Sequence, residues 1–154
     1  MLEENELIAL IKSTFGFGIL PRPEIVISDS CEHGCFEDAA NTFPKTREEA
    51  SIEDLEHCAV HALFLNEEAF RYLFPAFMIA GLNQSKGKES AELTSFCITG
   101  NVKDIEKRFT SFSVAERSAI YEYLQVITEN NMHMTAKDVA RKLKFWKDFC
   151  EFPS

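Results

Sequence analysis

The chain has 154 residues, of which 45% are hydrophobic and 27% charged, and its formal net charge is −9. This composition is typical of a globular protein and excludes a wholly disordered chain, a collagen and a coiled-coil rod. The longest uncharged apolar run, Tyr72–Leu82, is far shorter than the roughly 18–20 residues that span a bilayer, so we expect a single globular domain over residues 1–154.

The start of the chain predicts one helix followed by extended backbone. Apolar side chains between Leu7 and Phe15 recur at helical spacing, and Gly16 and Gly18 then end the helix. The two prolines that follow hold the backbone extended. Glu24–Ser28 has the composition of one short strand, although a single strand forms no sheet.

Two helices are predicted in the region that follows. The first leads from a turn at Cys31–Cys35 toward Phe43, and Pro44 ends it. Ser51 followed by Asp54 resembles a capping box at the start of the second. That helix places apolar side chains on one stripe, namely Ile52, Leu55, Ala59, Ala62 and Leu63.

The hydrophobic centre of the domain is predicted in the helix Glu67–Leu82. Asn66 caps this helix, and the part after Arg71 is apolar on every side, which is typical of a buried helix. Pro75 must kink the helix or start a second one, because its ring removes a hydrogen bond and clashes with the preceding turn.

The next segment is less regular. Asn83–Ser90 is predicted to be a polar, flexible loop. The overlapping run Gly81–Ser90 suggests a phosphate-binding loop, but five residues instead of four separate Gly81 from Gly87, and Glu89 stands where Ser or Thr should bind magnesium. Residues 91–98 fit either a short helix or an extended run.

Three further helices complete the chain. One is predicted over Asn101–Phe109, the next begins with a capping box formed by Ser113 and Glu116, and the last is capped by Thr135 and runs toward Phe149. Together the elements predict a mainly α-helical bundle of about six to eight helices, with at most one short strand or hairpin, packed around the central apolar helix.

Charge is distributed unevenly along the chain. Residues 1–77 carry a net charge of −10 and residues 78–154 one of +1, and the stretch 24–68 holds twelve acidic residues against Lys45 and Arg47. Such a surface repels phosphates, so we do not expect nucleic-acid binding. It suits a basic protein partner, or serves solubility alone. The predicted partner-binding face consists of Glu48, Glu49, Glu53, Asp54 and Glu56.

The last predicted helix is basic instead. Its cationic side chains are Lys137, Arg141, Lys142, Lys144 and Lys147. A basic amphipathic helix can dock on a membrane surface or an acidic target. Because Val139, Leu143 and Trp146 share one stripe, we favour an ordinary packed helix with a solvated basic face and expect no stable membrane association.

One cluster has the residue types of a metal site. Cys31, His33 and Cys35 lie within five residues, and a structural zinc site commonly takes four such ligands. The second pair would come from His57, Cys58 and His61, of which the two histidines lie one turn apart in a continuous helix. The other interpretation is surface histidines and inert cysteines, with no cofactor. The cysteine spacing is too long for a thioredoxin-like pair.

The cysteines predict the cellular location of the chain, and the absence of common catalytic motifs bears on whether it is an enzyme. The number of cysteines is five, and no basic-then-apolar leader follows Met1, so we expect reduced thiols in a cytoplasm. The sequence contains no G-x-S-x-G, H-E-x-x-H or G-x-G-x-x-G motif. No catalytic residue is therefore assigned.

The segment Leu65–Phe77 reads LNEEAFRYLFPAF. It resembles a family of uncharacterised bacterial proteins known only as a domain of unknown function, whose common pattern is an apolar helix ending in a Tyr-Leu-Pro-Ala-like run. Phe109–Arg117 and Trp146 are similar too, whereas Phe74 departs from the leucine of the family pattern. The resemblance implies a small helical bacterial protein and brings no catalytic residues.

The sequence leaves three functional hypotheses, and any oligomeric state fits them all. The one we favour least is an adaptor that docks on a membrane surface or an acidic target through the basic helix 137–147. The first is a non-enzymatic interaction protein, for example an immunity or antitoxin-type neutraliser whose acidic face blocks a basic toxin. The alternative is a small metal-dependent or thiol enzyme built on the Cys/His cluster. We favour the interaction protein, because its acidic stretch is the more pronounced feature of the sequence.

Overall fold

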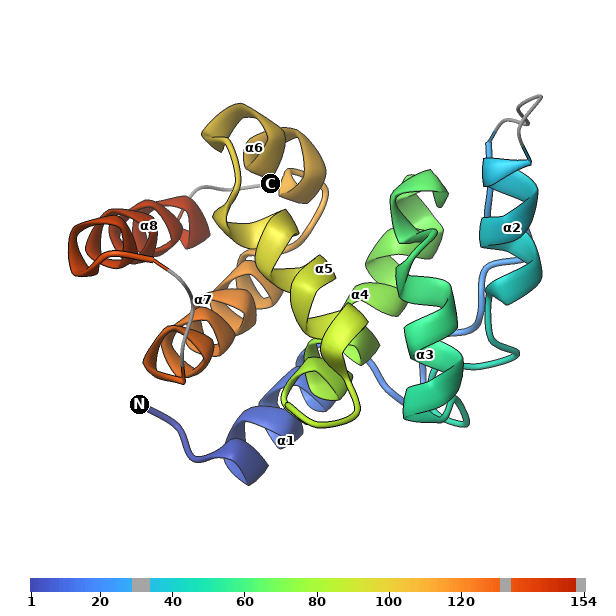
Figure 1. Ribbon diagram of the computed structural model, residues 1–154, viewed down its shortest axis with the longest axis horizontal. Helices are drawn as coiled ribbons and strands as arrows, with labels where there is room; N and C mark the ends of the chain where they lie inside the picture. Colours follow the sequence, from blue (N-terminus) through green and yellow to red (C-terminus); the bar gives the residue numbers. More distant parts are fainter. Residues whose placement is uncertain (29–33, 131–133, 152–154) are drawn as a thin grey trace. The chain divides into compact units, whose positions relative to one another are not determined.

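The structure of the chain is a computed structural model that describes residues 1–28, 34–130 and 134–151 (Figure 1). Within these ranges it has eight α-helices, one 3-10 helix and no strand, which confirms the predicted helical fold. The elements are α1 (Glu4–Thr14), α2 (Cys35–Thr42), α3 (Ile52–Ala59), η1 (Ala62–Phe64), α4 (Glu67–Gly81), α5 (Lys88–Thr99), α6 (Val102–Phe109), α7 (Val114–Glu129) and α8 (Ala136–Cys150).

The chain divides into two compact units. Met1–Thr14 and Cys97–Ser154 form one, called the terminal unit here, and Phe15–Phe96 form the other, called the central unit. One boundary follows α1 and the other lies within α5. The expectation of a single domain over residues 1–154 stays a prediction, and each unit is described by itself.

In the terminal unit, α7 packs along α8 and against α1. The predicted capping box is confirmed, because the Ser113 hydroxyl accepts a hydrogen bond from the Glu116 amide at 3.1 Å and the Glu116 carboxylate accepts one from the Ser113 amide at 2.8 Å. Thr135 caps α8 through the Asp138 amide, also as predicted. These local caps fix where both long helices begin.

Helix α8 also provides donors for the backbone at the end of α5. Trp146 donates from Nε1 to the Ile98 carbonyl at 2.7 Å, and Lys142 donates from Nζ to the Gly100 carbonyl at 2.7 Å. The last carbonyls of a helix have no partner within that helix. Side chains of α8 therefore satisfy acceptors that the end of α5 leaves open.

The central unit is built on α4, with α3 against α4 and α2 against α3. The predicted cap is confirmed, since Asn66 Oδ1 accepts a hydrogen bond from the Ala69 amide at 2.8 Å. The helix is buried on nearly all sides and continues through Pro75 as one element, so the second helix considered at that proline does not form. Among the described helices, none is both long and apolar enough to span a membrane.

Two predicted elements in this unit are wrong. Glu24–Ser28 forms no strand; instead the Val26 carbonyl accepts a hydrogen bond from the Asn66 amide at 2.9 Å, in a single contact with the start of α4. The helix after the Ser51 cap ends at Ala59, and the chain tightens into η1 before α4. Leu63, which was placed on the core stripe, is 50% exposed as a result.

The turn between α4 and α5 is also shorter than the predicted loop, because α5 begins at Lys88. Gly87 donates its amide to the Asn83 carbonyl at 2.8 Å. A Cβ atom at Gly87 would lie 1.9 Å from the Ala80 carbonyl oxygen, so this position requires glycine. The glycine that suggested a phosphate loop therefore serves the close packing of a helix–helix turn.

Candidate interaction surface of the central unit

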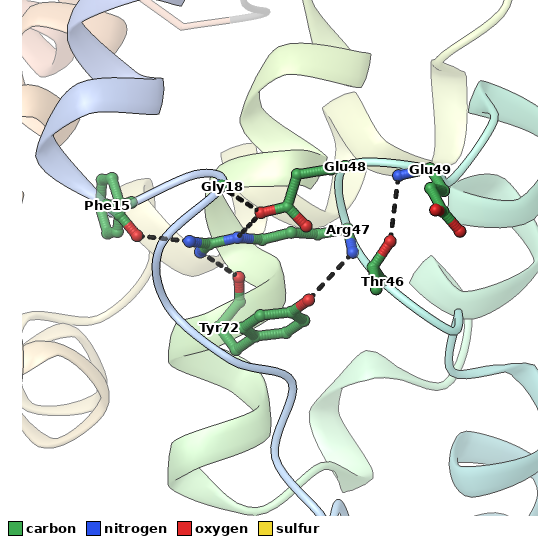
Figure 2. Close-up of polar contacts among 7 residues, drawn as sticks. All are labelled: Phe15, Gly18, Thr46, Arg47, Glu48, Glu49 and Tyr72. Carbon is green, nitrogen blue, oxygen red and sulfur yellow. Dashed lines mark hydrogen bonds and ion pairs between the residues drawn. The ribbon is translucent and has the colours of Figure 1, made fainter.

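A buried arginine organises one end of the central unit. Arg47 is 3% exposed, and its guanidinium donates to the Tyr72 carbonyl at 2.8 Å and to the Phe15 carbonyl at 2.5 Å (Figure 2). Its backbone amide donates to the Tyr72 hydroxyl at 3.1 Å. The guanidinium carbon also lies 4.1 Å from the ring centre of Phe17 and 4.6 Å from that of Tyr72. Arg47 thus joins three segments that are far apart in sequence.

Glu48 adds a contact from the surface, and Arg47 and Glu48 together are called the clamp here. Its Oε1 accepts a hydrogen bond from the Gly18 amide at 2.8 Å and lies 3.5 Å from Arg47 Nε (Figure 2). Partial burial by itself would raise the pKa of Glu48, but the hydrogen bonds from backbone amides and the charge of Arg47 leave that pKa below its usual value. The carboxylate therefore stays ionised and holds the turn at residues 16–18 in place.

The turn that the clamp holds carries exposed apolar side chains. Gly16 and Gly18 have φ angles of 70° and 80°, which L-residues rarely adopt. The Gly16 carbonyl accepts hydrogen bonds from the amides of Ile19, at 3.0 Å, and Leu20, at 2.8 Å. Ile19 is 88% exposed and Leu20 50% exposed. The backbone is well bonded here although its side chains face outward.

The predicted acidic face is only partly available. Glu48 belongs to the clamp, and Asp54 accepts a hydrogen bond from the Ser51 amide at 3.1 Å as part of the α3 capping box. Glu56 accepts from the amides of Glu89 and Ser90, at 3.0 and 2.7 Å, and so caps the start of α5. Those three carboxylates have internal roles. The remaining members of the face, Glu49 and Glu53, are exposed to solvent.

A pocket of about 490 Å³ lies between the end of α2 and the start of α3. Phe43 and Pro44 contribute apolar wall, and its charged or titratable side chains are Lys45, Glu49, Asp54 and His57. The volume is within the range of small-molecule sites. The pocket brings together two residues of the predicted acidic face and one of the predicted metal ligands.

The structure describes only part of the predicted metal site. Cys31 and His33 lie outside the described residues. Cys35 begins α2, His57 is exposed on α3, and His61 lies in the turn that follows that helix. The premise that the two histidines share a continuous helix is wrong, because α3 ends at Ala59. In the described ranges no three His, Cys, Asp or Glu residues form a group that could hold a metal ion, and the five-residue zinc site stays a prediction.

Burial raises the pKa of the Cys58 thiol to about 11 and that of the Cys97 thiol to about 11. Since the thiolate is the reactive form, we expect iodoacetamide at pH 8 to modify both at least about 100-fold more slowly in the folded chain than in urea. Peptide mass spectrometry measures the two rates, and the half-buried Cys35 is the internal comparison. Equal rates in the folded and unfolded chain would contradict the prediction.

Comparison with known proteins identifies the family of the chain. Residues 3–149 match the family described as "Family of unknown function (DUF6714)". Neither a curated protein nor a solved structure gives a significant match. The predicted resemblance to a family of unknown function is thereby confirmed. Because the match extends over nearly the whole sequence, the chain belongs to DUF6714, a family of unknown function.

Proposed function

We propose that the chain is a protein-interaction module whose central unit binds a basic partner protein. The observation that carries this proposal is the surface charge of residues 24–68. Of the two cations in that stretch, Arg47 is buried and bonded to backbone carbonyls, which leaves Lys45 as the exposed cation. The exposed carboxylates of Glu49, Glu53, Glu67 and Glu68 therefore face a single exposed cation of this stretch, and such a surface attracts a cationic protein over long range.

Exposed apolar side chains lie in the same unit as these acids. Ile25 is 69% exposed, and its carbonyl accepts a hydrogen bond from the Asn66 side chain at 2.9 Å. This bond holds Ile25 next to the first turn of α4, where Glu67 and Glu68 are exposed. Apolar area bordered by charge is the usual make-up of a protein interface.

The pocket between α2 and α3 supports the same function. Glu49 offers carboxylate oxygens beside the apolar Phe43 and Pro44. The last turn of α2 contains no basic residue, so the negative end of that helix lacks a cation of its own. A lysine or arginine side chain of the partner fits this pocket, because its charged group can pair with a carboxylate while its aliphatic stem packs on the apolar wall. Neutralisation of a basic toxin, as by an immunity protein or antitoxin, is one concrete form of the proposal.

Purification of the tagged chain from its native cells at low ionic strength tests the proposal. We expect a basic protein to co-purify and to be released by salt, because exposed charges are screened at high ionic strength. The double substitution Glu49→Gln with Glu53→Gln should weaken the complex about tenfold and reduce its salt dependence.

The matched control neutralises two exposed acids of the terminal unit, Glu106→Gln with Glu129→Gln, and should leave binding unchanged. Circular dichroism checks that both variants fold. Finding no partner at low salt, or a partner that both double variants hold equally well, would count decisively against the proposed function.

A further inference from the structure

The turn Gly16–Leu20 presents two apolar side chains on a backbone that is fixed from beneath. We propose that this turn is the apolar anchor by which the chain docks on a basic partner protein, with Ile19 and Leu20 entering an apolar recess that is bordered by lysine or arginine. The inference rests on the proposed function and adds the residues that supply its apolar contact.

The first support is rigidity. The Arg47 guanidinium donates a hydrogen bond to the Phe15 carbonyl, just before the turn. The Glu48 carboxylate accepts one from the Gly18 amide, within the turn (Figure 2). The Gly16 carbonyl then accepts the two amides of the exposed residues themselves. A loop already fixed in its bound conformation loses little conformational entropy on binding, and this raises affinity.

The second support is the exposure of the side chains that this scaffold carries. Turns are ordinarily rich in Gly, Asn, Asp, Ser and Pro, yet the tip here holds Ile19, 88% exposed, next to Leu20. Two adjacent exposed aliphatic side chains on a well-bonded turn can form the kind of central contact that contributes most of the binding energy in many interfaces.

The third support is the charge around the turn, which determines the kind of partner. Glu48 lies at the base of the turn and Glu49 follows it, both exposed. Of the cations near in sequence, Arg47 is buried, and Arg22, although exposed, donates to the Pro44 carbonyl at 3.0 Å and lies 4.8 Å from the ring centre of Phe43. Lys45 is then the exposed cation without such a contact to set against these carboxylates. A partner whose recess receives Ile19 and Leu20 therefore faces the carboxylates of this chain at the edge of the contact. Basic residues around the recess of the partner would complement these carboxylates.

Two synthetic peptides of equal charge test the inference without a purified partner. One alternates lysine with leucine and the other lysine with serine, and isothermal titration at low salt measures the affinity of the full chain for each. We expect the lysine–leucine peptide to bind about tenfold more tightly. The variant Ile19→Ser with Leu20→Ser should lose this advantage and still bind both peptides through charge.

The matched control replaces another exposed apolar pair of the central unit, Val60→Ser with Leu63→Ser, and should keep the tenfold advantage. The inference is overturned if the Ile19 and Leu20 variant still binds the lysine–leucine peptide more tightly than the lysine–serine peptide. It is also overturned if the control variant loses this preference to the same extent. In both cases the charge-based function stands. If neither peptide binds the unmodified chain, the proposed function fails as well. A lowered urea midpoint of the Ile19 and Leu20 variant would show that the chain itself covers these side chains, which also overturns the inference.

A second pair of variants tests the role of the clamp. Glu48→Gln removes the charge but keeps an acceptor for the Gly18 amide, whereas Glu48→Ala removes both. We expect the lysine–leucine advantage to persist in the glutamine variant and to fall at least severalfold in the alanine variant. Equal loss in the two variants would show that the rigid turn does not contribute and would overturn the inference.

Discussion

Replacing Arg47 by alanine is expected to lower the free energy of unfolding by about 3–5 kcal/mol. The substitution removes the charged donor of two buried hydrogen bonds, to the carbonyls of Phe15 and Tyr72, and a hydrogen bond of a charged group is worth roughly 1.5–3 kcal/mol. It also removes the contacts of the guanidinium with two aromatic rings, worth about 0.5–2 kcal/mol together. Urea unfolding followed by circular dichroism measures the change.

The conservative variant separates charge from geometry. Arg47→Lys keeps the positive charge, but an ammonium has no planar fork with which to reach two carbonyls while it stacks on a ring, so we expect a loss of about 2 kcal/mol. Lys45→Ala is the matched control, because Lys45 is exposed two residues away and its removal should change stability by less than about 0.5 kcal/mol. A loss in Arg47→Ala as small as that of the control would contradict the structural role of the clamp.

Features that depend on neighbours in sequence were predictable. The four caps at Ser51, Asn66, Ser113 and Thr135 were all predicted and are all confirmed, because a cap is a contact between residues two or three positions apart. The buried central helix was also predictable, since no pattern of polar residues could give it a solvent face. Local order of this kind established the helical fold.

Features that depend on distant residues were not predictable. Arg47 stands in the sequence Thr-Arg-Glu-Glu, which is typical of a solvated surface, yet its partners are 25 and 32 residues away. Glu56 likewise finds the start of α5 at Ser90, 34 residues on. A single sequence carries no signal for such pairings. The acidic face was consequently overestimated, because sequence alone could not distinguish carboxylates that cap and clamp from those that face solvent.

The length of one helix decided the arrangement of the predicted histidine pair. His57 and His61 have the spacing of a chelating pair only if α3 continues for two residues beyond its end at Ala59. The chain turns instead at Val60, where the His61 amide donates to the Cys58 carbonyl at 3.0 Å in the tighter 3-10 pattern. Helix ends are weakly determined by pattern, so an argument from i, i+4 spacing near a helix end is sensitive to a shift of one or two residues.

Trp146 is expected to be as important to the terminal unit as Arg47 is to the central unit. Its indole is fully buried, with ring centres 5.3 Å from Phe109 and 5.4 Å from Phe149. Replacing it by alanine should cost about 3–5 kcal/mol, since a large buried aromatic group leaves a cavity that the surroundings fill only in part. Because this is the single tryptophan of the chain, circular dichroism in urea rather than fluorescence must measure the change.

Trp146→Phe tests the hydrogen bond that ties α8 to the end of α5. Phenylalanine keeps most of the ring packing but cannot donate to the Ile98 carbonyl, which the helix itself leaves without a partner. We therefore expect a loss of about 1–3 kcal/mol, smaller than that of the alanine variant but well above that of Lys144→Ala, an exposed control on the same helix. If Trp146→Phe were as stable as the unmodified chain, packing alone would explain the role of Trp146. The indole hydrogen bond would then contribute nothing to the contact between α8 and the end of α5.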